Sequence, residues 1–152
     1  MKMLVTGGCG FIGSNFIIYT LKKYPHYKII NLDKLTYSGN PENLKCTYGN
    51  PNYRFVKGDI CDIEVVDKLI KDVDIVVHFA AESHVDRSIN ESSVFVRTNV
   101  LGTHTLLEAA RRNGNKRFHH ISTDEVFGTL SLAGNVKFNE NTAYNPRSPY
   151  AA

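Results

Sequence analysis

Short runs of apolar residues alternate along this chain with segments whose apolar positions recur every three or four residues. The apolar runs predict five strands, at residues 2–6, 29–32, 53–57, 73–81 and 118–122. Helical spacing predicts helices at 12–24, 62–71 and 93–112. Segments without a period predict loops, the first with a short helix, at 36–52 and 128–148. Such alternation predicts an α/β fold with a doubly wound parallel sheet, in which ligands bind beyond the carboxyl ends of the strands.

A glycine-rich turn joins the first predicted strand to the first predicted helix. The run Thr6-Gly7-Gly8-Cys9-Gly10-Phe11-Ile12-Gly13 places glycines at positions 7, 10 and 13. These glycines let the backbone turn sharply and approach a diphosphate, which then faces the free N–H groups of the helix start. A plain strand-to-helix turn is the alternative. Asp33 argues against it, because an acidic residue about 20 positions further on supplies the ribose contact of a dinucleotide site.

Asp33 also predicts which dinucleotide binds. Its carboxylate can accept hydrogen bonds from both ribose hydroxyls and would repel a 2′-phosphate, so NAD is favoured over NADP. Lys34 weakens this argument, because a basic residue there could hold a phosphate. After the third strand, Asp59-Ile60 could meet the adenine edge, although a simple turn or a helix-capping aspartate explains Asp59 equally well.

Polar residues gather at the ends of the fourth and fifth strands. Ala80 and Ala81 are small enough to leave room for a cofactor, and a dense polar run follows at 82–88. The adjacent carboxylates Asp124-Glu125 can divide into a protonated acid and an ionised base, although a solvated helix start also explains such a pair. Tyr150 can act as a base beside a nicotinamide when a nearby cation stabilises its phenolate.

Composition narrows the class of protein. With 152 residues, 42% hydrophobic and 22% charged, the chain is expected to form one globular domain. The net charge of +3 is small and the basic residues are scattered, which disfavours nucleic-acid binding. No apolar stretch is long enough to span a bilayer, and the glycine turn interrupts any signal-peptide pattern, so we expect a cytoplasmic protein.

The cysteines and histidines lack the spacing of disulfide or metal sites. Three cysteines are an odd number and are expected to be reduced thiols: Cys9, Cys46 and Cys61. No metal site is expected, and we interpret five histidines as core or hydrogen-bonded residues: His78, His84, His104, His119 and His120.

Five segments together resemble the extended short-chain dehydrogenase/reductase family of NAD-dependent epimerases and dehydratases. They are the runs 6–13, 33–40, 80–88 and 122–128, and Ser148-Pro149-Tyr150. The glycine run is shared by the whole superfamily, whereas 82–88 and Thr123-Asp124-Glu125 are typical of sugar-nucleotide dehydratases. The resemblance implies a Rossmann-like NAD-binding domain over 1–152. It also implies that the last strands, a smaller substrate domain and the lysine four residues after Tyr150 lie outside this chain.

The resemblance further implies a hydro-lyase that converts dTDP-glucose to dTDP-4-keto-6-deoxyglucose. Tyr150 would take the C4 hydroxyl proton as hydride passes to NAD, with Thr123 hydrogen-bonded to the C4 oxygen. Glu125 would then remove the C5 proton while Asp124 protonates the leaving C6 hydroxyl, and hydride would return to C6. Substrate contacts are implied for Glu82, Ser83 and Thr123. NAD contacts are implied for Gly7, Gly10, Phe11, Ile12, Gly13, Asp33, Lys34, Leu35, Thr36, Asp59, Ile60, Phe79, Ala80, Ala81, Ser83 and Thr98, with Asn99 in support.

Two alternatives stay open. One is a UDP-sugar 4,6-dehydratase or 4-epimerase of the same fold, against which Asp124-Glu125 argues. The other is a non-catalytic NAD-binding module, because these 152 residues alone are expected to lack turnover and to bind NAD at best weakly. The resemblance implies a homodimer formed partly by the long helix. We nevertheless expect its apolar residues to pack within the chain, namely Phe95, Val96, Val100, Leu106 and Leu107.

Overall fold

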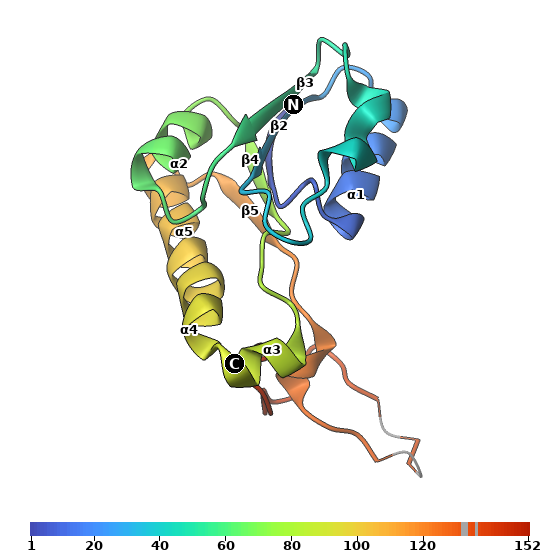
Figure 1. Cartoon of the computed structure of the whole chain (residues 1–152), viewed down its shortest axis with the longest axis vertical. Helices are drawn as coiled ribbons and strands as arrows, with labels where there is room; N and C mark the ends of the chain where they lie inside the picture. The colour runs from blue at the N-terminus through green and yellow to red at the C-terminus, as the bar shows by residue number, and fades with distance from the viewer. Residues whose placement is uncertain (132–133, 136) are drawn as a thin grey trace.

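A computed structural model describes residues 1–131, 134–135 and 137–152, and it places one parallel sheet between two layers of helix (Figure 1). Within the described residues the sheet has five strands in the order β3-β2-β1-β4-β5. Their bounds are β1 Lys2–Thr6, β2 Lys28–Asp33, β3 Tyr53–Lys57, β4 Ile75–His78 and β5 Arg117–His120. The order reverses direction between β1 and β4, and a crevice for a ligand forms at such a switch point. The predicted doubly wound fold is therefore confirmed.

The register brings the strand ends to one level. Thr6, the last residue of β1, pairs with Leu32 of β2 and with His78 of β4. Asp33 in turn pairs with Lys57, the last residue of β3. The segments that leave these four strands therefore begin side by side at the carboxyl edge of the sheet.

Helices cover both faces of the sheet (Figure 1). One face carries α1, Phe11–Lys23, and the short helix η1, Pro41–Thr47; the other carries α2, Ile63–Ile70, and α5, Thr103–Arg112. Side chains alternate between the two faces along each strand. Val5 accordingly packs on the α1 side with Ile17, whereas Leu4 packs on the α2 side with Val66 and Leu106.

The remaining short helices lie beyond the carboxyl edge of the sheet (Figure 1). They are α3 Val85–Asn90, α4 Ser92–Phe95, the π-helical turn η2 Val96–Gly102, and η3 Asp124–Phe127. The expected long helix over 93–112 thus consists of α4, η2 and α5, and its middle is π-helical. Gly102 lets this helix approach the β3–α2 connection, because a Cβ there would lie 2.5 Å from Ile60.

Several expectations need correction. The fourth and fifth strands end earlier than predicted, at His78 and His120, and α3 was not predicted at all. Val96, Val100 and Leu107 are 57%, 58% and 46% exposed, so they are not core residues, although Phe95 and Leu106 are buried as expected. The expected loop at 128–148 includes residues 132–133 and 136, which lie outside the described residues. Its described part contains no helix or strand.

Candidate functional site

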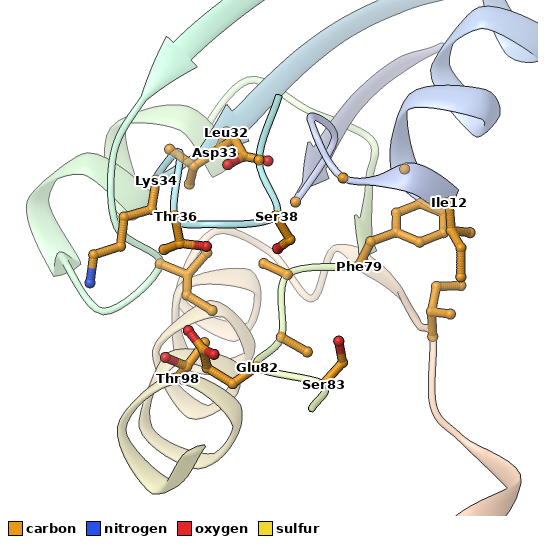
Figure 2. Close-up of a pocket in the computed structure, with 18 of the residues that line it drawn as sticks. Ile12, Leu32, Asp33, Lys34, Thr36, Ser38, Phe79, Glu82, Ser83 and Thr98 are labelled. Carbon is orange, nitrogen blue, oxygen red and sulfur yellow. The ribbon is translucent and has the colours of Figure 1, made fainter. Parts of the chain in front are cut away.

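A cleft of about 400 Å³ opens at the carboxyl edge of the sheet (Figure 2). Its walls come from the β1–α1 turn, from the segments that follow β2, β3, β4 and β5, and from η2. Tyr150, near the end of the chain, also lines it. Most of the residues predicted to contact a cofactor therefore meet in one cavity, even though they are far apart in the sequence.

The floor of the cleft is the glycine turn, and its close contacts require glycine. Gly7 has a positive φ of +71°, and a Cβ there would lie 2.6 Å from the backbone nitrogen of Ala80. A Cβ on Gly13 would collide with the carbonyl oxygen of Gly7. Gly10 is the N-cap of α1. Among the described residues, no side chain there accepts a hydrogen bond from the first N–H groups of the helix, and the first turn has no acidic residue. Its free N–H groups and positive dipole end therefore suit a diphosphate.

Asp33 lies at the end of β2 with 8% of its surface exposed. One carboxylate oxygen accepts a hydrogen bond of 2.8 Å from the N–H of Cys9, and the other accepts one of 2.8 Å from Leu35. Each oxygen keeps a free lone pair, because a carboxylate oxygen accepts two hydrogen bonds. The hydroxyl groups of Thr36 and Ser38 point into the open centre of the cleft (Figure 2). This polar end of the cleft fits a ribose.

Lys34 is paired with a carboxylate in this structure. Its Nζ lies 2.8 Å from Oδ2 of Asp59, and Figure 2 shows the ammonium group directed away from Asp33. The other oxygen of Asp59, Oδ1, accepts a hydrogen bond of 2.9 Å from the N–H of Cys61. Helix α2 is instead capped by Asp62, which accepts from Glu64 and Val65. Of the two alternative interpretations of Asp59, the helix cap is therefore wrong and the turn is confirmed, because the N–H of Asp62 also donates to the carbonyl oxygen of Asp59 over 3.0 Å.

The segment after β4 is held from two sides. Phe79, Ala80 and Ala81 line the cleft, as does Glu82, which is buried. The Asn99 side chain on η2 accepts a hydrogen bond from the Glu82 N–H and donates one to its carbonyl oxygen, each 2.9 Å long. The Glu82 carboxylate also lies 3.3 Å from the Arg87 guanidinium. The two hydrogen bonds to Asn99 and the ion pair with Arg87 together fix the cleft wall at Glu82.

His78 lies beneath the cleft as a buried bridge between three elements. Its Nδ1 is 2.6 Å from the hydroxyl of Thr6 on β1, and its Nε2 is 3.0 Å from the hydroxyl of Thr103 on α5. Burial, with a smaller contribution from nearby His120, lowers the pKa of His78 to about 4. The ring is therefore neutral at pH 7, which confirms its interpretation as a hydrogen-bonded core histidine. His84, His104, His119 and His120 are exposed, so they are not core residues.

The predicted acid–base residues lie at the edge of the cleft. Ile121 and Ser122, which follow β5, line it, but the lining described here does not include Thr123, Asp124 or Glu125. Thr123 caps η3, because its hydroxyl accepts a hydrogen bond of 3.3 Å from the N–H of Glu125. Leu35 is also outside the lining and contributes only its N–H to Asp33.

Sequence reasoning missed several lining residues. Ser38 and Gly39 lie within the run 33–40 on which the resemblance rests, and a Cβ on Gly39 would lie 2.9 Å from Oδ1 of Asp33. Arg97 carries no motif that marks it, although it precedes the predicted residue Thr98 on η2 and lines the same cleft. The other missed lining residues are Leu32, Gly58, Val94, Ile121 and Ser122.

Titratable groups do not assemble a metal site here. Within the described residues, no three His, Cys, Asp or Glu side chains are grouped closely enough to hold an ion. Cys9, Cys46 and Cys61 are free thiols, as predicted. Burial and the Asp33 charge raise the pKa of Cys9 to about 11, so this thiol stays protonated at neutral pH.

Among the described residues, no helix is long and apolar enough to cross a membrane.

The switch point, the glycine turn and the acidic end of β2 together define a Rossmann-type dinucleotide-binding domain. The family model described as GDP-mannose 4,6 dehydratase matches residues 4–152. The chain therefore belongs to this family.

Named relatives lie close in sequence and in structure. The chain is 51% identical to dTDP-glucose 4,6-dehydratase from Mycobacterium tuberculosis, covering 100% of this chain and 45% of that protein. It is 52% identical to the low-salt glycan biosynthesis protein Agl12 from Haloferax volcanii, covering 100% of this chain and 48% of that protein. The chain thus spans about half the length of the curated relatives it matches.

Solved structures show the same fold. DesIV, a dTDP-glucose 4,6-dehydratase from Streptomyces venezuelae solved with NAD bound, superposes with a TM-score of 0.93 at 48% identity, covering 99% of this chain and 47% of that chain. UDP-glucose 4-epimerase from Brucella ovis, also in complex with NAD, gives a TM-score of 0.84 at 29% identity, covering 99% of this chain and 43% of that chain. The likeness in sequence is greater to the dehydratase than to the epimerase.

Proposed function

We propose that this chain is the NAD-binding part of a cytoplasmic sugar-nucleotide dehydratase that converts dTDP-glucose to dTDP-4-keto-6-deoxyglucose. The observation that carries the proposal is the convergence of the glycine turn, Asp33 and Tyr150 on one cleft. The identity of about 50% to dTDP-glucose 4,6-dehydratases supports the choice of substrate. Because those relatives are about twice as long, we assign recognition of the nucleotide part of the substrate to a further domain.

We assign NAD one orientation in the cleft. The diphosphate would face the N–H groups at the start of α1, the ribose would bind Asp33, and the adenine would lie near Asp59 and Ile60. Phe79, Ala80, Ala81, Ser83 and Thr98 would hold the rest of the cofactor along the segment after β4. When bound, NAD supplies a reversible two-electron acceptor, so that an alcohol can be oxidised and reduced within one cycle.

The proton transfers are assigned to side chains of this chain. Oη of Tyr150, which lines the cleft, would accept the proton of the C4 hydroxyl, and the Thr123 hydroxyl would hydrogen-bond to the C4 oxygen. Ketone formation at C4 acidifies the C5 proton, which the Glu125 carboxylate would remove. Asp124 would protonate the departing C6 hydroxyl, and Glu82 and Ser83 would position the sugar. Catalytic contacts often become short only with substrate bound, so the present edge position of Asp124 and Glu125 is compatible with these roles.

The exposed face of the long helix supports a homodimer. Val96, Val100, Leu101 and Leu107 expose between 46% and 58% of their surface there. Contiguous exposed apolar residues of this kind are typical of protein–protein interfaces. Sedimentation of the protein and of a Val100→Glu variant would test the assignment, since a dimer through this face should dissociate in the variant.

Assays on a protein that contains both this chain and the further domain proposed above distinguish the dehydratase from the two alternatives. Incubation with NAD and dTDP-glucose should yield the 4-keto-6-deoxy product by mass spectrometry, with much slower turnover of UDP-glucose. Conversion of UDP-glucose to UDP-galactose would instead support an epimerase. NAD binding without turnover of any sugar nucleotide would support the non-catalytic module.

Cofactor choice gives a separate test. NAD should bind at least tenfold more tightly than NADP, a difference of roughly 1.4 kcal/mol. Calorimetric titration with both cofactors measures this ratio. Equal affinities would contradict the proposed ribose contact of Asp33.

A further inference from the structure

Three charged side chains converge where the adenosine part of the cofactor would lie. They come from three different elements: Lys34 follows β2, Asp59 follows β3, and Arg97 is on η2. Oδ2 of Asp59 lies 2.8 Å from Nζ of Lys34 and 4.0 Å from Nη2 of Arg97. All three residues line the same cleft as Asp33. One carboxylate oxygen thus lies close to Lys34 and at the outer limit of an ion pair with Arg97, beside the acidic residue proposed to bind the ribose.

The position of Asp59 is fixed independently of these cations. Its other oxygen, Oδ1, accepts the hydrogen bond from the Cys61 N–H. The Cys61 thiol donates to the carbonyl oxygen of Arg97 over 3.2 Å, which ties the turn after β3 to η2. Partial burial alone would raise the pKa of Asp59, but the Lys34 ammonium and the Cys61 N–H outweigh it and hold this pKa below its usual value. Asp59 is therefore ionised at neutral pH.

The charges at this end of the cleft balance. Asp33 and Asp59 contribute two negative charges, and Lys34 and Arg97 contribute two positive charges. The Asp59 side chain is 24% exposed, whereas those of Lys34 and Arg97 are 54% and 63% exposed. The two cations can therefore move, and the carboxylate that holds them is the fixed partner. Without that carboxylate, Lys34 and Arg97 would keep their charges in the same cleft but lose the partner that positions them.

A 2′-phosphate carries close to two negative charges and is bound by Lys and Arg side chains. In this cleft, such a group would meet Asp33 and two cations that are already neutralised. We propose that Asp59 is a second determinant of cofactor specificity, which excludes NADP by holding Lys34 and Arg97 away from the 2′-position. This inference rests on the proposed NAD-binding function. It differs from the role of Asp33, because Asp59 acts through the two cations.

Calorimetric titration of Asp59→Asn with NAD and NADP tests the proposal. The amide keeps an oxygen for the Cys61 N–H but loses the charge. The Kd ratio of NADP to NAD should fall about tenfold or more relative to the unchanged protein. Any lost adenine contact cancels in this ratio, since both cofactors carry the same adenine. The triple variant Asp59→Asn/Lys34→Gln/Arg97→Gln should recover most of the original ratio, because it removes both freed cations.

Matched variants separate this effect from changes in net charge and folding. Asp72→Asn removes the same charge at an exposed position outside the cleft and should leave the ratio unchanged. Asp59→Ser supplies a shorter oxygen acceptor for Cys61 and should lower the ratio in the same direction, so it serves if the asparagine variant does not fold.

The outcomes distinguish the two proposals. If the unchanged protein binds neither cofactor, the proposed function fails. If it binds NAD but the ratio is the same in both Asp59 variants, only the role of Asp59 is overturned. A fall in the ratio that persists after both Lys34 and Arg97 are replaced would also overturn it, because the freed cations would then not be the cause.

Discussion

The two ends of the cleft are built in different ways. At the glycine turn, backbone packs directly on backbone, because Gly7 lies against Ala80, and the carboxylate of Asp33 is buried and bonded to two N–H groups. After β5, Asp124 and Glu125 are exposed, and the short helix η3 has no buried residue. The end proposed to bind the cofactor is therefore preformed. The end proposed to carry the acid and base depends on contacts made around it.

This difference indicates how the chain divides binding from chemistry. A preformed site binds without the cost of ordering loops and side chains. Acid and base groups must instead reach reacting atoms to within hydrogen-bond distance, often only after substrate binds. If the comparison is right, changes at the glycine turn should affect cofactor affinity, and changes after β5 should affect rate at unchanged cofactor affinity.

The largest effect is expected from the carboxylates after β5. In an enzyme that contains this chain and the proposed further domain, Asp124→Asn and Glu125→Gln should each slow elimination by about 10²–10⁴-fold, the usual contribution of a positioned acid or base. Oxidation at C4 should remain measurable, because Tyr150 is unchanged. Stopped-flow absorbance of NADH after addition of dTDP-glucose records this step. A variant that binds NAD and substrate normally but forms no NADH would show that the roles are wrongly divided.

Gly7→Ala should weaken NAD binding at the glycine turn. The new Cβ would lie 2.6 Å from the Ala80 nitrogen, on a backbone with a φ of +71°. Because backbone atoms cannot move aside easily, we expect NAD affinity to fall by about a hundredfold or more, roughly 2.7 kcal/mol. Gly49→Ala is the matched control, since Gly49 has a φ of +83° and nothing within 4 Å of the added Cβ. It should lower stability but leave the Kd for NAD unchanged, as calorimetry and urea unfolding can show.

The titration of His78 makes the stability of the folded protein depend on pH. Its pKa is about 4 in the folded protein, below the ordinary value of 6.5, because burial and nearby His120 disfavour the charged ring. The unfolded chain therefore binds this proton more tightly, and the stability contributed above pH 6.5 is lost as the pH falls toward 4. Between pH 7 and pH 5 we expect a loss of about 2 kcal/mol from this residue.

Urea unfolding at the two pH values measures that loss. His78→Gln should be less stable at pH 7 but should lose less stability at pH 5 than the unchanged protein. His104→Gln, at an exposed position, should keep the original pH dependence. Parallel losses in all three proteins would mean that His78 does not titrate as its burial implies.

Local signals explain why the cofactor end was predictable. The glycine turn and Asp33 are recognised by spacing within one strand–helix–strand unit, and the register of β1 against β2 then brings them together. The pairing of Lys34 with Asp59 was not predictable, because it depends on β2 lying beside β3 and on which rotamers the side chains adopt. Arg97 reaches the cleft from η2, next to the predicted residue Thr98, and no sequence motif marks it.

Apolar periodicity also fails where the described residues leave an apolar side chain uncovered. Val96 and Val100 have helical spacing, yet both are exposed, because periodicity predicts a face and not what covers it. The helix α3 has the opposite problem. Only Ser88 is buried in it and Ile89 is 67% exposed, so no apolar stripe marks it as a helix. Contacts made by other groups, such as the ion pair of Arg87 with Glu82, hold its position.

The smallest effect is expected at Phe127, which links η3 to the segment before Tyr150. Its ring centroid lies 5.2 Å from that of Phe138 and 5.6 Å from that of Tyr144, and Val126 accepts a backbone hydrogen bond of 2.9 Å from Asn145. Phe127→Ala removes the aromatic contact, so elimination should slow by about three- to tenfold, roughly 0.7–1.4 kcal/mol. The Kd for NAD should not change. Phe127→Tyr keeps the ring and should retain full activity. Equal loss of NAD affinity and rate in Phe127→Ala would show that the two ends of the cleft are not separable.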